Sequence, residues 1–128
     1  MEGKMTNKKI LVVDDEEIIR KTIRIHLGKM GYESKEAIDG VDALKKLGEE
    51  KFDLLICDIL MPKKDGWEVL KELRSDPSTK DMPVIVLTAK TRDEDMFRGY
   101  DLGANYFMTK PFTKSQLFYG IKLMFGEA

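Results

Sequence analysis

Residues 54–62, with the sequence LLICDILMP, combine an unbroken apolar run with an acidic end, Asp58. The four apolar residues before Asp58 predict a short, fully buried strand, bounded downstream by Pro62. Buried runs of this kind are typical of parallel sheets that are covered on both faces. Because Asp58 ends the run, we expect its carboxylate at the C-terminal edge of the sheet, where ligands bind in open α/β folds. On its own, such an aspartate would more simply cap the following turn.

Four more segments of the chain have strand-like patterns. Apolar runs at residues 10–13 and 84–87 predict two further buried strands. Residues 105–109 predict another strand, and the charged segment 33–38 suits an exposed edge of the sheet. The sequence therefore predicts five strands in all.

A segment with helical spacing follows each strand. The expected apolar stripes are Ile19, Ile23, Leu27 and Met30; Val41, Leu44 and Leu47; Val69, Leu70 and Leu73; Met96, Phe97 and Tyr100; and Leu117, Ile121 and Met124. Capping residues precede the last four helices: Asp39, Asp65, Thr91 and Thr113. We expect Gly48 to end the second helix and Trp67 to be partly exposed. Strand and helix alternate five times, which predicts a single doubly wound (βα)5 domain of the α/β class, with helices on both faces of a parallel sheet.

The composition indicates one domain with nearly balanced charge, since the 128 residues include 23 acidic and 22 basic ones. The net charge of −1 gives no overall field that would favour nucleic acid or a membrane as a direct partner. Cys57 is the only cysteine, which fits a cytoplasmic protein, and no apolar run reaches the ~20 residues of a membrane span. We expect residues 1–7 to be a disordered lead and residues 8–128 to form the domain, without an output domain attached.

The predicted strand ends bring chemically related residues to one edge of the sheet. Asp14, Asp15, Asp58, Thr88 and Lys110 each lie at or just past the end of a strand. Crowded carboxylates repel each other, which raises a pKa or recruits a cation. With oxygen ligands only, a hard cation such as Mg²⁺ is the natural occupant. Asp58 could act as a nucleophile towards phosphorus, while Lys110 and Thr88 hold the remaining phosphoryl oxygens.

Several motifs in this arrangement resemble the receiver domain of bacterial response regulators, the chemotaxis regulators among them, which act in two-component signalling. They are Asp14-Asp15, Asp58-Ile59-Leu60-Met61-Pro62 with Asp65-Gly66, Thr88-Ala89 and Lys110-Pro111-Phe112. The resemblance runs from about Lys8 to Phe125, nearly the whole chain. It implies a flavodoxin-like fold with the strand order 2-1-3-4-5.

The resemblance also implies a reaction at Asp58. A partner histidine kinase or phosphotransfer protein would pass a phosphoryl group from its phosphohistidine to this carboxylate. Mg²⁺, or Mn²⁺ in its place, would be held by Asp15, Asp58 and the backbone carbonyl of Leu60, with Asp14 binding through water. Lys110 would contact the phosphoryl group and precede a cis peptide bond. Such a domain is not an enzyme acting on other molecules, since it catalyses only its own phosphorylation and its slow dephosphorylation.

A conformational switch is the second implication of the resemblance. Thr88 would turn inward to bind a phosphoryl oxygen, and Phe107, three residues before Lys110, would move from an exposed to a buried rotamer. Tyr106 would take this role if the register were one residue different. The switch would reshape the face of the fourth helix, fifth strand and fifth helix for a downstream protein, with the regulator acting as a monomer or as a phosphorylation-dependent dimer.

Three other readings share parts of this pattern. A haloacid-dehalogenase-type phosphatase also uses an aspartate at a strand end, but its second acid, two residues later, is replaced here by Leu60. A flavodoxin-like flavin carrier needs a phosphate-binding first loop, which Asp14-Asp15-Glu16-Glu17 would repel. A binding module that is never phosphorylated would keep the fold without the chemistry. A phosphorylation switch is the reading that uses all five edge residues.

Overall fold

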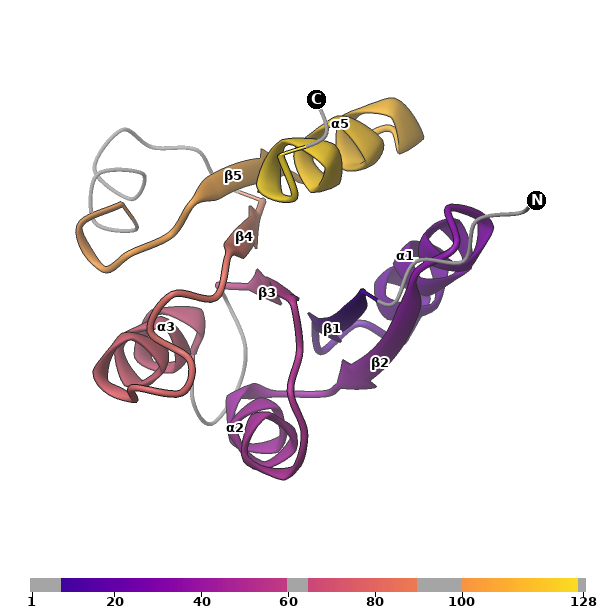
Figure 1. The fold of residues 1–128 in the computed structure, drawn as a ribbon. Coiled ribbons are helices and arrows are strands. Elements are labelled where there is room, and N and C mark those ends of the chain that lie inside the picture. Colours follow the sequence, from indigo (N-terminus) through magenta and orange to yellow (C-terminus); the bar gives the residue numbers. More distant parts are fainter. Residues whose placement is uncertain (1–7, 60–64, 90–99, 127–128) are drawn as a thin grey trace.

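The computed structural model describes residues 8–59, 65–89 and 100–126. Five strands form one sheet in the order β2-β1-β3-β4-β5, and all four neighbouring pairs are parallel (Figure 1). The strands are β1 (Lys9–Val13), β2 (Glu33–Ala37), β3 (Leu54–Asp58), β4 (Val84–Thr88) and β5 (Tyr106–Thr109). The predicted parallel sheet and its strand order are confirmed, including the edge position of the charged strand β2.

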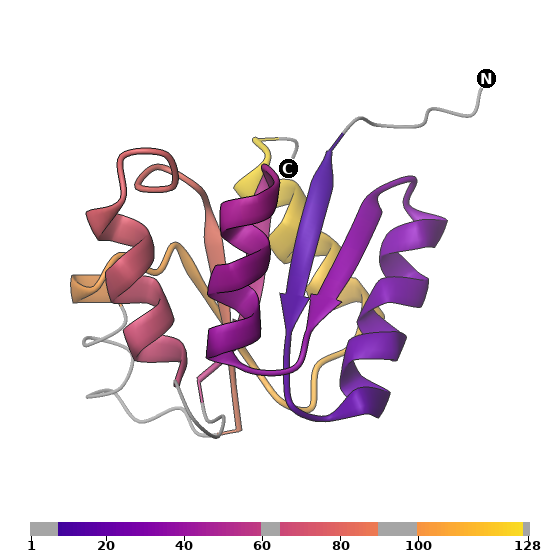
Figure 2. The ribbon, with the colours of Figure 1, turned by 90° about the horizontal axis from the view of Figure 1, so that it is seen from below.

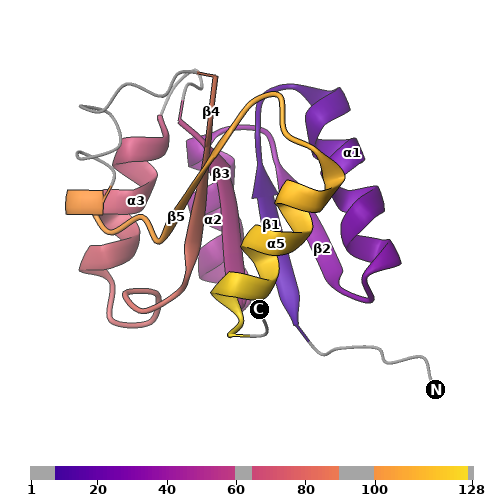
Figure 3. The ribbon, with the colours of Figure 1, turned by 90° about the horizontal axis from the view of Figure 1, so that it is seen from above.

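Helices cover both faces of the sheet. Helices α1 (Glu17–Lys29) and α5 (Lys114–Met124) lie on one face, as the view from above shows (Figure 3). Helices α2 (Gly40–Glu49) and α3 (Gly66–Ser75) lie on the other (Figure 2). Most of the helix expected after Thr91 lies outside the described residues, as do the lead at 1–7 and the loop at 60–64. Over the described part of the chain, no helix has the length and apolar character needed to cross a bilayer.

Two apolar cores flank the sheet because alternate strand residues point to opposite faces. In β1, Ile10 and Val12 pack towards α1 and α5, whereas Leu11 and Val13 pack towards α2 and α3. The three central strands are almost entirely buried on both faces. This explains why their sequences are continuous apolar runs, while β2 at the edge is charged.

The helix starts agree with the capping pattern in the sequence. The Asp39 side chain accepts a hydrogen bond from the backbone N–H of Asp42 at the start of α2. Asp65 and Thr113 each form a complete capping box, at α3 and α5 respectively. The predicted caps are therefore confirmed wherever the structure describes them, and the candidate at Thr91 lies outside the described residues.

Three details differ from the expectations. Helix α2 continues past Gly48 to Glu49, because the helix tolerates glycine where nothing forces the chain to turn. Val41 is 53% exposed, because the buried face of α2 is set by Gly40 and Ala43. Trp67 is only 7% exposed, since it packs into the core beneath α3.

Candidate functional site

The carboxyl edge of the sheet brings the predicted site residues together. Asp14 follows β1, Asp58 ends β3 and Thr88 ends β4, and each of these three residues is at most 4% exposed. Lys110 follows β5, and its side chain is 12% exposed. Because charged side chains are rarely buried without a partner, this cluster calls for an account of how its charges are balanced.

The Lys110 ammonium is the cation at the centre of this edge. Its Nζ lies 2.8 Å from Asp14 Oδ2 and donates a hydrogen bond of 3.2 Å to Asp58 Oδ2. A third contact of 3.3 Å reaches Glu16 Oε2. Burial alone would lower the pKa of this ammonium, but its contacts with Asp14 and Asp58 outweigh burial and hold the pKa above its usual value. Lys110 therefore stays charged and joins the first loop to the phosphoacceptor candidate.

The loop after β1 carries more negative charge than Lys110 can balance. Asp14, Asp15 and Glu16 each offer a carboxylate oxygen within 4.8 Å of the others. Burial raises the pKa of Asp14 despite its contact with Lys110. Its Oδ2 atom is buried, and among the described residues the contact that this oxygen makes is the one to the Lys110 ammonium at 2.8 Å. A buried carboxylate oxygen beside other oxygen donors fits a hard divalent cation, so the residues present suit Mg²⁺ or Mn²⁺. Asp58 is not one of these three residues. It is linked to them through the Lys110 ammonium, which contacts both Asp14 and Asp58.

Backbone contacts fix the position of Asp58 and Lys110. The Lys110 N–H donates to the Thr88 carbonyl at 2.8 Å, and the Lys110–Pro111 peptide bond is cis, as expected. A Cβ at Gly66 would lie 2.5 Å from the Asp58 carbonyl oxygen. Glycine at this position therefore lets the start of α3 lie directly against the backbone of Asp58.

The two aromatic residues of β5 face opposite sides of the sheet. The Phe107 ring lies 5.1 Å from Tyr100 and 6.4 Å from Trp67, measured between ring centroids, on the side of α3. Tyr106 packs into the core of the α1 and α5 side, beneath Gly120. Of these two aromatic residues, Phe107 is therefore the one whose ring packs against Tyr100.

Comparison with known proteins identifies this arrangement. The family model described as "Response regulator receiver domain" matches residues 10–122. The chain belongs to the response regulator receiver domain family. It is therefore a receiver domain of the kind that works in two-component signalling.

The relatives of this receiver domain include proteins much longer than it and solved chains of about its own length. It is 46% identical over 111 residues to the alkaline phosphatase synthesis transcriptional regulatory protein PhoP of Bacillus subtilis, covering 87% of this chain and 45% of that protein. The Vibrio cholerae chemotaxis protein CheY4 matches with a TM-score of 0.89 and 34% identity, over 93% of this chain and 99% of that one. The phosphorylated cyanobacterial phytochrome response regulator RcpA matches with a TM-score of 0.81 and 36% identity, over 91% and 92%.

The length of the relatives bears on one expectation. The receiver domain spans less than half the length of the curated relatives that it matches, namely 45% and 43%. The expected stand-alone regulator therefore stays a prediction.

Some site residues of the receiver domain lie outside the described residues or were missed. Leu60, the expected backbone ligand, lies outside them. Glu16 was not predicted as a site residue, although it contacts Lys110; the run of four acids after β1 was the available signal. Arg20 was also missed, although its place on the buried stripe with Ile23 and Leu27 could have indicated an arginine with buried partners.

Proposed function

We propose that this receiver domain accepts a phosphoryl group on Asp58 in the presence of a divalent cation. The observation that carries the proposal is the buried Asp58 carboxylate at the end of β3, bonded at 3.2 Å to an ammonium that also contacts Asp14. A purely structural aspartate would need a cationic partner, but not one that it shares with an acidic loop beside it.

The transfer is a direct displacement at phosphorus. An Asp58 carboxylate oxygen forms the new O–P bond while the N–P bond of a phosphohistidine breaks, and the electron pair of that bond stays on the imidazole. Lys110 would move from the carboxylates to the new phosphoryl oxygens, and the Thr88 hydroxyl would donate to another of them. A bound Mg²⁺ or Mn²⁺ would neutralise charge there, held by Asp15, Asp58 and the Leu60 carbonyl, with Asp14 binding through water.

The proposed role is that of a switch rather than of an enzyme acting on other molecules. The domain would catalyse its own phosphorylation and a slow loss of the phosphoryl group. Phe107 would respond to the position of Thr88, at the neighbouring strand end, and change the face that includes β5 and α5. The orientation of Phe107 towards Tyr100 and Trp67 supports this residue, and not Tyr106, as the mobile aromatic.

The proposed partners are proteins. A sensor histidine kinase or phosphotransfer protein would supply the phosphoryl group in the cytoplasm, and a downstream protein target would read the switched face. The near balance of acidic and basic residues gives the domain itself no field that would attract nucleic acid. A phosphorylation-dependent dimer is the alternative readout of the same face.

The test is intact mass spectrometry after incubation with acetyl phosphate and Mg²⁺. We expect wild type to gain one phosphoryl group only when Mg²⁺ is present, and Asp58→Asn to gain none. Asp53→Asn is the matched control, because Asp53 precedes the same strand at the opposite edge of the sheet and bonds the Lys9 N–H there. This control should be phosphorylated like wild type. Equal phosphorylation of wild type and Asp58→Asn would show that another residue is the acceptor.

A further inference from the structure

Arg20 is a charged residue on the buried side of a helix. Only 8% of it is exposed, and it shares the buried face of α1 with Ile23 and Leu27. A guanidinium carries five N–H donors and cannot lose its charge, so burial requires specific acceptors around it. Its surroundings therefore indicate what this position does.

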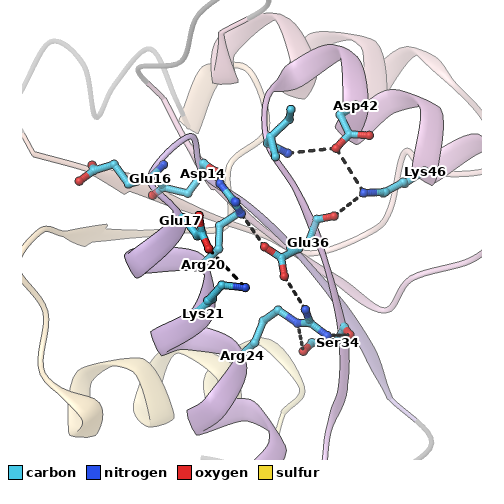
Figure 4. Close-up of polar contacts among 11 residues, drawn as sticks. Asp14, Glu16, Glu17, Arg20, Lys21, Arg24, Ser34, Glu36, Asp42 and Lys46 are labelled. Atoms are coloured by element: carbon cyan, nitrogen blue, oxygen red, sulfur yellow. Dashed lines mark hydrogen bonds and ion pairs between the residues drawn. The ribbon is translucent and has the colours of Figure 1, made fainter.

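Arg20 donates hydrogen bonds to two parts of the sheet: the loop that follows β1 and the edge strand β2 (Figure 4). Its Nη1 donates to the backbone carbonyl oxygen of Asp14 at 2.8 Å. Its Nε donates to Glu36 Oε1, in β2, at 2.6 Å. The guanidinium thus connects the loop that leaves β1 to the neighbouring edge strand.

Glu36 is itself held in place from the other side. Its second oxygen, Oε2, accepts a hydrogen bond of 2.5 Å from Arg24 Nη1, one helical turn after Arg20. Arg24 also donates to the side chain and the carbonyl of Ser34, both at 3.1 Å. Arg20 therefore bonds a carboxylate whose own position is fixed, and this arrangement orients the guanidinium towards the Asp14 carbonyl.

The Asp14 carbonyl belongs to the peptide group that joins Asp14 to Asp15. A bond to this oxygen fixes the plane of that peptide group, and hence the directions in which the two side chains leave the backbone. The Asp14 N–H is bonded as well, to the Ala37 carbonyl at 3.3 Å. The segment that carries the acidic cluster is therefore attached to β2 directly and through Arg20.

We propose that Arg20 is a positioning residue for the divalent-cation site, acting through its hydrogen bond to the Asp14 carbonyl with Glu36 as its support. This inference rests on the proposed function, because the cation would bind Asp14 and Asp15. Partners one layer behind the metal ligands typically change metal affinity about 10- to 100-fold when they are removed.

The direction of the effect separates positioning from charge. Replacing Arg20 with glutamine removes a positive charge near an acidic site, and electrostatics alone would make cation binding tighter. Loss of positioning makes binding weaker. Arg24→Gln is the matched control, because Arg24 bonds the same carboxylate, Glu36, while its other hydrogen bonds within the described part of the chain go to Ser34 and not to Asp14.

The experiment is a titration of the full chain with Mn²⁺, following free Mn²⁺ by electron paramagnetic resonance. Circular dichroism at the same temperature establishes that each variant is folded. We expect Arg20→Gln to raise the Kd for Mn²⁺ about tenfold. Arg24→Gln should raise it much less, because Arg20 keeps both of its own hydrogen bonds in that variant. Arg20→Lys, which keeps the charge but cannot bridge both acceptors with a planar fork, should also bind Mn²⁺ more weakly than wild type. It serves as the test if Arg20→Gln does not fold.

Three results would overturn the inference, and they are distinguishable. A wild-type or lower Kd in Arg20→Gln, while Asp15→Asn abolishes binding, would leave the metal site intact and remove the role of Arg20. Equal weakening in Arg20→Gln and Arg24→Gln would assign the effect to general stabilisation of β2 and α1. The absence of saturable Mn²⁺ binding by wild type would overturn both this inference and the metal site on which it rests.

Discussion

Two partly buried cations lie at opposite edges of the sheet, and their surroundings differ in charge. At the amino edge of β4 and β5, the Arg74 guanidinium donates to the carbonyls of Gly103, Lys80 and Met82 at 2.6, 2.9 and 2.7 Å. It also donates to Asn105 Oδ1 at 2.9 Å. These acceptors are neutral, and they belong to the two loops that lead into β4 and β5. Arg74 therefore connects these loops to each other.

At the carboxyl edge, the Lys110 ammonium is surrounded by carboxylates instead. Asp14, Asp58 and Glu16 all contact it, so negative charge exceeds positive charge among the groups that meet there. Arg74 supplies the hydrogen bonds that these neutral acceptors need, so they require no ligand. The acidic edge has an excess of negative charge that a bound cation would balance, and such unbalanced charge in a folded chain is typical of a functional site.

The largest expected effect lies on the balanced side of this comparison. Arg74→Met should lower the free energy of unfolding by about 3 kcal/mol, because several carbonyl oxygens lose their donor at once. Lys71→Met, at an exposed position on the same helix, should leave stability nearly unchanged. Urea unfolding of both variants measures the difference. A loss below about 1 kcal/mol would mean that water replaces the guanidinium and that Arg74 is not structural.

Glu36 is a carboxylate whose charge is balanced, because two arginines donate hydrogen bonds to it. It therefore contrasts with the carboxylates around Lys110. Hydrogen bonds from Arg20, and then from Arg24, lower the pKa of Glu36 below its ordinary value of 4.5. A lowered carboxyl pKa stabilises the fold above the unfolded-state value, and this contribution is lost as the pH falls through the folded-state pKa. Glu36→Gln should therefore cost about 1.5 kcal/mol at neutral pH.

The pH dependence of that cost is the measurement. Urea unfolding of wild type and Glu36→Gln should give a difference that shrinks as the pH falls below 4.5. A difference that stays constant from neutral to acidic pH would show that the charge of Glu36 is not what the two arginines recognise.

Much of the fold was predictable because its signals are local. The buried runs of β1, β3 and β4 alternate with capped amphipathic helices, and three of the predicted caps are present in the structure. The strand ends then place Asp14, Asp58 and Lys110 at one edge by topology alone. The proximity of these three residues could therefore be predicted from the sequence.

Other features could not be predicted because they depend on contact between residues far apart in the sequence. Arg20 bonds Glu36 across 16 positions, and Arg74 bonds Gly103 across 29. No periodicity in the sequence indicates such pairs. Trp67 was misjudged for the same reason, because its burial depends on contact with β5 through Phe107.

We expect the excess negative charge at the carboxyl edge to lower the stability of the fold and to be balanced by a bound cation. Burial raises the pKa of Asp14, so its charged form is less favourable in the folded protein than in the unfolded chain. Without divalent cations, Asp14→Asn should stabilise the fold by about 1 kcal/mol. Lys110 would keep Asp58 and Glu16 as partners in this variant, so no unpaired charge is left behind.

The most direct test is the free energy of unfolding of wild type and Asp14→Asn, each measured with and without Mg²⁺. We expect the variant to be the more stable protein without Mg²⁺, and Mg²⁺ to stabilise wild type much more than the variant, because only a cation that binds the folded state adds stability. A variant that is less stable than wild type without Mg²⁺, together with equal responses to Mg²⁺, would contradict the account and make the acidic edge a structural feature like Arg74.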